Sequence, residues 1–225
     1  MILTSEAYPF ISIITVSLNA SGFIEQTIQS VLNQTYPNLE YVIIDGGSVD
    51  GTVNIIQKYE SSLSYWHSKP DRGLYHAFNL GLQHARGDWI LYLNADDYFW
   101  DHRVLERMGP HLKRHRGADV VFGQVGMIPR NGENPEPTAF FGAPWRWPQF
   151  RLICTIPHQA ALTRRGYFQR WGIFDERWRI AGDYELYLRA GAALMARFVP
   201  EVVSVMREGG LSLGNVIPSF FGVQH

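Results

Sequence analysis

Residues 87–98 read Gly87-Asp88-Trp89-Ile90-Leu91-Tyr92-Leu93-Asn94-Ala95-Asp96-Asp97-Tyr98, and the rest of the chain is organised around them. After a turn, the apolar run from Trp89 to Leu93 predicts a buried strand. Two adjacent carboxylates, Asp96 and Asp97, follow it. Carboxylates at the carboxyl end of a buried strand lie where open α/β sheets bind ligands. The pair suits Mg²⁺, which takes one or two carboxylates together with substrate phosphates, whereas a turn or a helix cap is the simpler alternative.

The residues before this stretch alternate between β-branched apolar runs and helical patterns. This alternation predicts parallel strands joined by right-handed helical crossovers. The predicted strands span residues 11–17, 39–44 and 64–67, and the predicted helices carry residues 24–32, 52–59 and 73–86.

The second half of the chain is less regular. It predicts helices at residues 103–116 and 183–193, strands at 118–125, 196–199 and 202–206, and a hairpin turn at 130–133. The fold class is therefore α/β, with a mostly parallel central sheet flanked by helices and an irregular C-terminal half. We expect one continuous domain over residues 1–225, with a nucleotide-binding half at about 10–100 and a more variable half at about 101–225.

Composition narrows the function classes. The 225 residues carry a net charge of −1 at pH 7, which does not favour nucleic acid as a partner. A single cysteine, Cys154, excludes an internal disulfide and is better explained as a small buried hydrophobe than as a nucleophile. The sequence shows neither a signal peptide nor a membrane span, so we expect a cytoplasmic protein, with peripheral membrane contact left open.

Polar side chains mark the ends of three predicted strands: Ser17 and Asn19, then Asp45, then Asp96 and Asp97. In a parallel sheet these ends lie at one edge and can converge on a ligand. The phosphate-binding patterns G-x-x-x-x-G-K-[ST] and G-x-G-x-x-G are both absent, so neither P-loop phosphoryl transfer nor hydride transfer has support.

His111 and His115 stand four residues apart on a predicted helix, a spacing that could bind zinc. Lys113, Arg114 and Arg116 surround them, and we favour a solvated cationic helix face.

Several of these segments together resemble a family 2 glycosyltransferase of the GT-A fold. Within that family, the combination of segments resembles the branch that builds bacterial exopolysaccharides and colanic-acid-type polymers. It covers residues 10–100 strongly and resumes more weakly later. The segments that carry it are Ser12 to Thr52, Lys69 to Gly81, Ala85 to Asp97, His158 to Ala160, Gly172 to Glu176 and Ala181 to Leu186.

The resemblance implies a role for each matching position, with Mg²⁺ or Mn²⁺ as cofactor. It implies nucleotide-sugar contacts at Asp45, Asp71, Arg72 and Asp96, beside the polar strand end Ser17 and Asn19; metal ligation by Asp97 with Asp96; and a catalytic base at Asp183. On the acceptor side, the expected contacts are His158, Gln159 and Trp145, with a structural histidine and a hydrophobic flap as the alternatives for His158 and Trp145.

Two positions depart from the family pattern. The common double acid after the second strand is Asp45-Gly46 here, and the usual late Glu-Asp pair is Gly182-Asp183. We prefer Asp183 to Glu185 as the base, because helix residues two apart point about 200° away from each other and cannot share one cleft. A helix N-cap is the structural alternative for Asp183.

These residues predict an inverting, metal-dependent glycosyltransferase that uses a nucleotide-diphosphate sugar, with UDP favoured. The expected acceptor is a glycan or lipid-linked glycan at the inner face of the cytoplasmic membrane. One alternative is a sugar nucleotidyltransferase, although the loop at residues 17–22 lacks the Gly-rich, basic character of that class. The other is a non-catalytic nucleotide-sugar-binding homologue.

Overall fold

The structure is a computed structural model that describes residues 8–129 and 136–209. Its strands are β1 (Ile11–Ser17), β2 (Leu39–Asp45), β3 (Tyr65–Ser68), β4 (Trp89–Tyr92), β5 (Tyr98–Phe99), β6 (Val120–Ile128), β7 (Ala139–Phe141), β8 (Ala161–Arg164) and β9 (Ala196–Arg207). Its helices are α1 (Ile24–Leu32), α2 (Thr52–Lys58), α3 (Leu74–His84), α4 (Val104–Arg114), α5 (Trp147–Phe150), α6 (Arg165–Trp171) and α7 (Gly182–Leu188). Single turns of 3₁₀ helix are η2 (Glu60–Ser62), η3 (His158–Ala160) and η4 (Gly191–Ala193).

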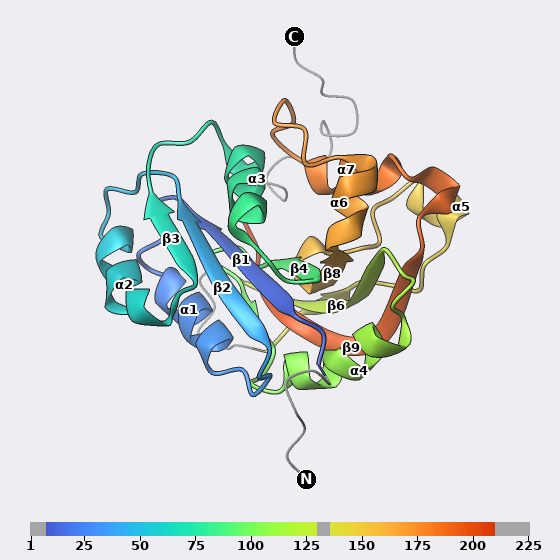
Figure 1. Cartoon of the computed structure of the whole chain (residues 1–225), viewed down its shortest axis with the longest axis horizontal. Helices are drawn as coiled ribbons and strands as arrows, with labels where there is room; N and C mark the ends of the chain where they lie inside the picture. Colours follow the sequence, from blue (N-terminus) through green and yellow to red (C-terminus); the bar gives the residue numbers. More distant parts are fainter. Residues whose placement is uncertain (1–7, 130–135, 210–225) are drawn as a thin grey trace.

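One curled sheet runs through the described part of the chain, in the order β3-β2-β1-β4-β8-β6-β9-β5, with β7 beside β6 (Figure 1). Strands β1 to β4 pair only in parallel among themselves, as the strand and helix alternation predicts. Further along, β8 is antiparallel to β4 and β6, whereas β9 is parallel to β6 and antiparallel to β5. Traced through these pairings, six of the nine described strands run in one direction.

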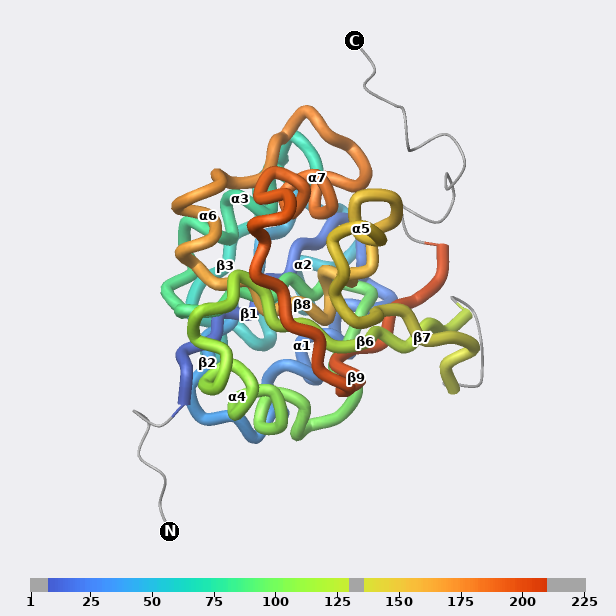
Figure 2. Tube along the Cα trace, turned by 90° about the vertical axis from the view of Figure 1, so that its right-hand side faces the viewer, coloured from blue at the N-terminus to red at the C-terminus, as the bar shows by residue number. Residues whose placement is uncertain are grey.

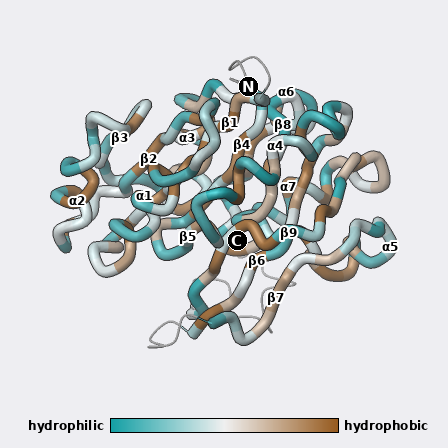
Figure 3. Tube along the Cα trace, turned by 90° about the horizontal axis from the view of Figure 1, so that it is seen from below, coloured by the Kyte–Doolittle hydropathy of each residue, from teal (hydrophilic) through white to brown (hydrophobic). Residues whose placement is uncertain are grey.

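Helices cover both faces of this sheet, and the central strands feed both layers. Ile11 and Ile13 of β1 pack with α1, α2 and α4, whereas Ile14 and Val16 pack with α3, α6 and α7. Alternate side chains of a strand point to opposite faces, so a strand buried on both faces must be apolar throughout. Figure 3 shows this as hydrophobic stretches along the central strands and hydrophilic outer connections.

The second half differs from its prediction in several elements. The two strands predicted at 196–199 and 202–206 are one strand, β9, whose pairing with β6 changes register around Pro200. Proline has no N–H for the ladder, so an irregularity at that point keeps the strand continuous. The helix predicted at 183–193 ends at Leu188, and the turn η4 follows it.

Strands β5, β7 and β8 and helix α6 were not predicted. Figure 2 shows β7 and the end of β6 extending beyond the main body of the molecule. The hairpin predicted at residues 130–133 lies outside the described residues. Among the described residues, no helix has the length and apolar character needed to cross a bilayer.

Candidate active site

The polar strand ends gather at one edge of the sheet, as predicted. Strand β1 lies between β2 and β4, and all three run in the same direction. Ser17 and Asp45 are register partners at the ends of their strands, and their side chains are hydrogen bonded at 2.8 Å. The loop after β4 brings Asp97 to the same edge, beside β1.

Asp45 is fully buried and accepts five hydrogen bonds from its own chain. The hydroxyls of Ser17, Ser48 and Ser68 donate at 2.8, 2.5 and 2.6 Å, and the amides of Gly47 and Ser48 donate at 3.1 and 2.8 Å. Burial by itself raises the pKa of this carboxyl, but these hydrogen bonds outweigh it and lower the pKa below its usual range. Asp45, which was predicted to contact the nucleotide base, fixes the loop after β2 in this structure.

Asn19 joins the loop after β1 to the loop after β2. Its backbone is left-handed, with φ of 51°, a conformation that asparagine tolerates better than most residues. The backbone amide of Asn19 donates to the Ser48 hydroxyl at 2.7 Å, and its side-chain oxygen accepts from the Val49 backbone amide at 3.0 Å. The residue predicted as a nucleotide contact thus also shapes the edge.

Asp71 and Arg72 extend this edge from the segment before α3. Asp71 caps the segment by accepting from the Gly73 amide at 2.7 Å, and Arg72 pairs with Glu176 at 2.7 Å. A Cβ on Gly46 would lie 2.7 Å from the Asp71 carboxylate. Gly46, which stands where the family carries its second acid, therefore leaves space that the Asp71 carboxylate occupies.

Asp97 is the least satisfied buried carboxylate at this edge. It is 1% exposed, and its oxygens meet the Arg207 amide at 3.4 Å and the Asn94 side-chain amide at 3.3 Å, both near the limit of hydrogen bonding. The Gln159 side chain also hydrogen bonds to it. Burial, and then the charge of Asp96, raises the pKa of Asp97 to about 7. Its backbone carbonyl accepts from the Thr27 hydroxyl at 2.6 Å, which fixes the turn that presents the side chain.

This environment fits a hard divalent cation. The side-chain oxygen of Asn94 is buried without a hydrogen-bond partner beside the buried carboxylate of Asp97. Within residues 8–129 and 136–209, no three His, Cys, Asp or Glu side chains form a complete ligand set. A site of one or two carboxylates that relies on substrate phosphates for further oxygens is the arrangement Mg²⁺ favours.

Asp183 is the second residue of α7. The Tyr75 hydroxyl accepts from the Gly182 amide at 2.7 Å and donates to Asp183 Oδ1 at 3.4 Å. The other oxygen, Oδ2, meets His158 Nδ1 at 3.2 Å. Burial by itself raises the pKa of Asp183, but His158 and the Tyr184 amide lower it below the usual carboxyl range, so the group is ionised at neutral pH.

The predicted acceptor-side residues divide into two groups. His158 also contacts the Asn94 amide through Nε2 at 3.1 Å, and Gln159 is buried beside it. These two residues join the Asp97 and Asp183 cluster. Trp145 instead packs on Phe150, with ring centroids 4.8 Å apart, and the Phe150 ring contacts Tyr184. Trp145 thus stands in an aromatic wall next to Tyr184, the residue that follows Asp183.

Comparison with known proteins agrees with this geometry. A family model described as Glycosyl transferase family 2 matches residues 12–172, which is most of the chain. The chain belongs to glycosyl transferase family 2.

The curated relatives of this glycosyl transferase family 2 member include mycobacterial proteins. A PGL/p-HBAD biosynthesis glycosyltransferase of Mycobacterium bovis is 32% identical over 212 residues, which cover 92% of this chain and 80% of the relative. An uncharacterized glycosyltransferase of Mycobacterium tuberculosis is 31% identical over 188 residues, covering 81% and 69%. The exopolysaccharide and colanic-acid branch suggested by the sequence does not appear in the descriptions of these relatives.

Solved structures share the fold. TarS of S. aureus, residues 1–349 in complex with UDP, superposes with a TM-score of 0.73 at 20% identity over 88% of this chain. The match spans 60% of that TarS chain. The mannosyltransferase PcManGT of Pyrobaculum calidifontis, in complex with GDP-Man and Mn²⁺, gives 0.64 at 20% identity, covering 88% of this chain and 57% of that one. The fold is the GT-A fold expected from the sequence.

Three residues of the site escaped the sequence analysis: Asn94, Tyr75 and Arg207. Arg207, at the end of β9, binds the Asp96 carbonyl at 2.5 Å and lies 5.1 Å from the rings of Phe23 and Tyr98. Asn94 had a local signal, since it directly follows the apolar run of the opening stretch. Arg207 and Tyr75 reach the site only through tertiary packing.

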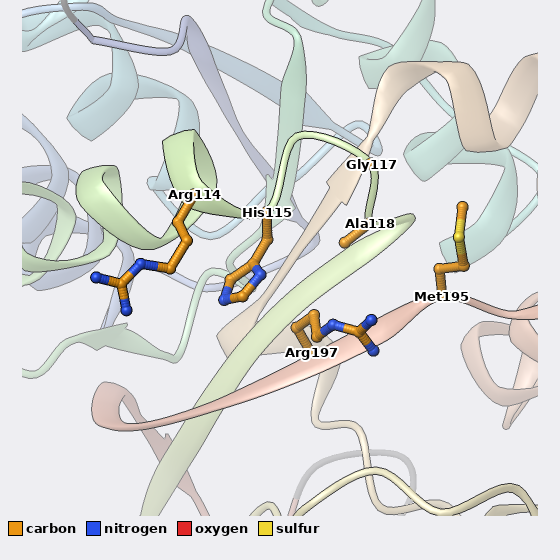
Figure 4. Close-up of a pocket in the computed structure, with 6 residues that line it drawn as sticks. All are labelled: Arg114, His115, Gly117, Ala118, Met195 and Arg197. Atoms are coloured by element: carbon orange, nitrogen blue, oxygen red, sulfur yellow. The ribbon is translucent and has the colours of Figure 1, made fainter.

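A hollow of about 240 Å³ lies at the opposite end of the sheet, where β6 and β9 begin (Figure 4). Arg114, His115 and Arg197 line it, and the two guanidinium groups point to opposite sides of His115. Burial and the neighbouring cations lower the pKa of His115. Helix α4 ends at Arg114, so His115 lies just beyond it, and Arg114 and Arg197 give this surface the cationic character predicted for the segment.

Proposed function

We propose that this protein is an inverting, metal-dependent glycosyltransferase that moves a sugar from a nucleotide-diphosphate sugar to a glycan or lipid-linked acceptor. One observation carries the proposal. A carboxylate suited to act as a base, Asp183, is connected by a single imidazole and a single amide to the strand end that holds Asp97. In this proposal, the leaving-group side and the acceptor side of the transfer site meet at one edge of the sheet.

Family membership and the polar edge support a nucleotide-sugar donor. The solved structures of similar fold were obtained with UDP and with GDP-Man, and we extend that ligand class to this chain. The loop anchored by Asp45, with Asp71 behind it, is the proposed place of the base and ribose. UDP is the proposed nucleotide.

Asp97, with Asp96 and the unpartnered oxygen of Asn94, is the proposed cation site for Mg²⁺ or Mn²⁺. When bound, the cation neutralises charge that develops on the departing diphosphate.

The chain's own residues then account for the transfer. An acceptor hydroxyl oxygen forms a bond to the anomeric carbon as the bond from that carbon to the diphosphate oxygen breaks. The hydroxyl proton passes to the Asp183 carboxylate, and the electron pair of the broken bond leaves with the diphosphate. A single displacement on the face opposite the leaving group inverts the anomeric centre, through an oxocarbenium-like transition state.

The acceptor proposal rests on the relatives and the resemblance. The mycobacterial relative takes part in PGL/p-HBAD biosynthesis, and the sequence resembles enzymes of polysaccharide assembly. We propose an acceptor held at the inner membrane face, with the aromatic wall of Trp145 and Phe150 beside the acceptor entrance.

Replacing the proposed base tests this function most directly. Asp183→Asn should lower transfer by roughly 10²–10⁴-fold, because general-base assistance is lost. Its affinity for nucleotide should not change. Calorimetric titration with UDP, GDP and dTDP, in Mn²⁺ and in EDTA, measures binding. Release of nucleoside diphosphate from a panel of UDP- and GDP-sugars, with short glycans or a dispersed lipid extract, measures turnover.

Glu185→Gln is the matched control, because Arg189 already holds the Glu185 carboxylate at 2.6 Å. It should keep turnover within a few-fold. Equal turnover by Asp183→Asn and wild type would remove Asp183 as the base. Metal-dependent nucleotide binding by wild type without any turnover would favour the non-catalytic homologue.

A further inference from the structure

His158 lies between the two carboxylates that the proposed function places on opposite sides of the reaction. Its Nδ1 is 3.2 Å from Asp183 Oδ2, and its Nε2 is 3.1 Å from Asn94 Nδ2. The same Asn94 nitrogen is 3.3 Å from Asp97 Oδ2. The side chains of His158 and Asp183 are 19% and 21% exposed, so solvent reaches both only in part.

In this series of hydrogen bonds, the donor and acceptor roles follow from the carboxylates of Asp183 and Asp97 at its two ends. An ionised carboxylate only accepts hydrogen bonds, so His158 must donate through Nδ1 to Asp183. An amide nitrogen only donates, so the two N–H groups of Asn94 serve His158 Nε2 and Asp97. In the neutral imidazole, one tautomer satisfies every contact. Burial by itself lowers the pKa of His158, but the hydrogen bond and charge of Asp183 outweigh it and raise the pKa. The tautomer follows from the network, as it does where a carboxylate orients a histidine.

The two oxygens of Asp183 differ in how they are held. Oδ2 meets His158, whereas the Tyr75 hydroxyl reaches Oδ1 only at 3.4 Å, near the limit of a hydrogen bond. The backbone amides of Asp183 and Tyr184 also favour the ionised carboxylate. Oδ1 is therefore the oxygen that the imidazole leaves for an acceptor hydroxyl, whose proton it can take. The imidazole decides which oxygen faces the acceptor, because it holds the other one.

We propose that His158 is a positioning residue for Asp183. It holds the carboxylate in one orientation and makes that orientation depend, through Asn94, on the strand end that carries Asp97. The inference rests on the proposed role of Asp183 as the base. It replaces the direct acceptor contact expected for His158 from the sequence.

Other groups around Asp183 do not substitute for the imidazole. Tyr75 of α3, Tyr187 of α7 and Cys154 face it, and burial raises the pKa of each of these groups, so all three stay neutral at neutral pH. Among the described residues, His158 is the side chain that donates to Oδ2.

Two amide substitutions separate positioning from bulk and polarity. The amide nitrogen of His158→Asn can occupy the place of Nδ1 and still donate to Asp183, whereas the longer side chain of His158→Gln carries its amide toward the place of Nε2. Both are studied in the full chain beside wild type. Glycosyl transfer is measured as kcat and as KM for donor and acceptor, across pH.

We expect His158→Gln to lose kcat on the order of 10²-fold, with each KM changed by less than about threefold. Its acidic pH limb should move to higher pH, because Asp183 loses the donor that favours its ionised form. His158→Asn should keep kcat within about fivefold of wild type and leave the limb in place. Calorimetric nucleotide binding reports whether each variant is folded.

Three results would overturn the inference: wild-type kcat in His158→Gln, equal losses in the two variants, or a raised acceptor KM with unchanged kcat. The last would make His158 an acceptor contact. Should His158→Gln fail to bind nucleotide, His158→Ala takes its place, and added imidazole should recover part of kcat; no recovery counts against the inference. Asp183→Asn distinguishes the two proposals. If this variant stays active, Asp183 is not the base; if it is inactive while His158→Gln behaves as wild type, only the positioning role of His158 is rejected.

Discussion

Asp45 and Asp97 are two buried carboxylates at the same edge of the sheet, but their surroundings are opposite. Asp45, the last residue of β2, is 0% exposed and accepts five hydrogen bonds. Asp97, after β4, is 1% exposed and has fewer donors: Gln159, and the long contacts to Asn94 and Arg207. The pKa of Asp45 is lowered, whereas that of Asp97 is raised to about 7. Burial therefore does not identify a reactive carboxylate, because the number of donors around it decides whether it anchors a loop or remains available to a cation.

The largest effect that separates the two is expected on turnover. Asp97→Asn should lower transfer by roughly 10³-fold, because the charge that holds the cation at the leaving group is lost. The metal-dependent part of nucleotide affinity should be lost with it. Steady-state rates over a series of Mg²⁺ and Mn²⁺ concentrations, with calorimetry, measure both.

Asp88→Asn is the matched control, since Asp88 is exposed at the other end of β4. It should behave as wild type. Full activity of Asp97→Asn at ordinary Mg²⁺ would contradict both the cation site and the distinction drawn from Asp45.

The donor half shows how far the sequence alone can predict. Strand β1 spans residues 11–17 as predicted, and β2 and β4 differ by one residue at their ends. Each is a long apolar run between turn residues, so its signal is local. The convergence of Ser17, Asp45 and Asp97 then follows from parallel pairing alone.

The acceptor half depends on contacts that no local pattern contains. Strand β5 is two residues long and pairs with residues 204–205, about a hundred positions away. The links of His158 to Asp183 and Asn94 span 25 and 64 positions. Asp183 itself was found through resemblance, whereas the imidazole beside it could be placed only by the tertiary structure.

A second, smaller contrast is expected in stability, and its sign differs between the two carboxylates. Asp45→Asn should lower the free energy of unfolding by about 2 kcal/mol at pH 7, because donors lose their acceptor. The pKa of Asp45 is lowered on folding, so its stabilisation is present above the ordinary carboxyl pKa and is lost as the pH falls through the folded value. The deficit of Asp45→Asn should therefore shrink below about pH 4.

Asp97→Asn should do the reverse in EDTA. The pKa of Asp97 is raised from 3.8 to about 7 on folding, so its contribution is full below the lower value and is lost as the pH rises through the upper one. The variant should gain stability over wild type between these values and keep the gain above them. Urea unfolding at pH 4 to 8 measures both variants, and a loss of stability in Asp97→Asn at pH 8 would contradict the account of its environment.

The smallest expected effects concern the two glycines that stand where the family carries acids. A Cβ on Gly182 would lie 2.7 Å from the ring of Tyr75, which is 4% exposed, whereas a Cβ on Gly46 would lie 2.7 Å from the carboxylate end of Asp71. A buried ring cannot move aside, but the end of a half-buried side chain can rotate. Gly182→Ala should therefore cost about 1–3 kcal/mol of stability and displace Asp183, whereas Gly46→Ala should cost less than about 1 kcal/mol.

Thermal and urea unfolding of the two alanine variants, with kcat and nucleotide affinity, test this pair. Gly182→Ala should lower kcat more than nucleotide affinity, because Tyr75 and Asp183 lie on the proposed acceptor side. Gly46→Ala should change nucleotide affinity more than kcat, because Asp71 stands on the donor side. A larger stability cost at Gly46 than at Gly182 would mean that the Asp71 carboxylate is held as firmly as the Asp45 carboxylate. Asp71 would then anchor its loop as Asp45 does, and Asp97 would be the exception among the acids at this edge.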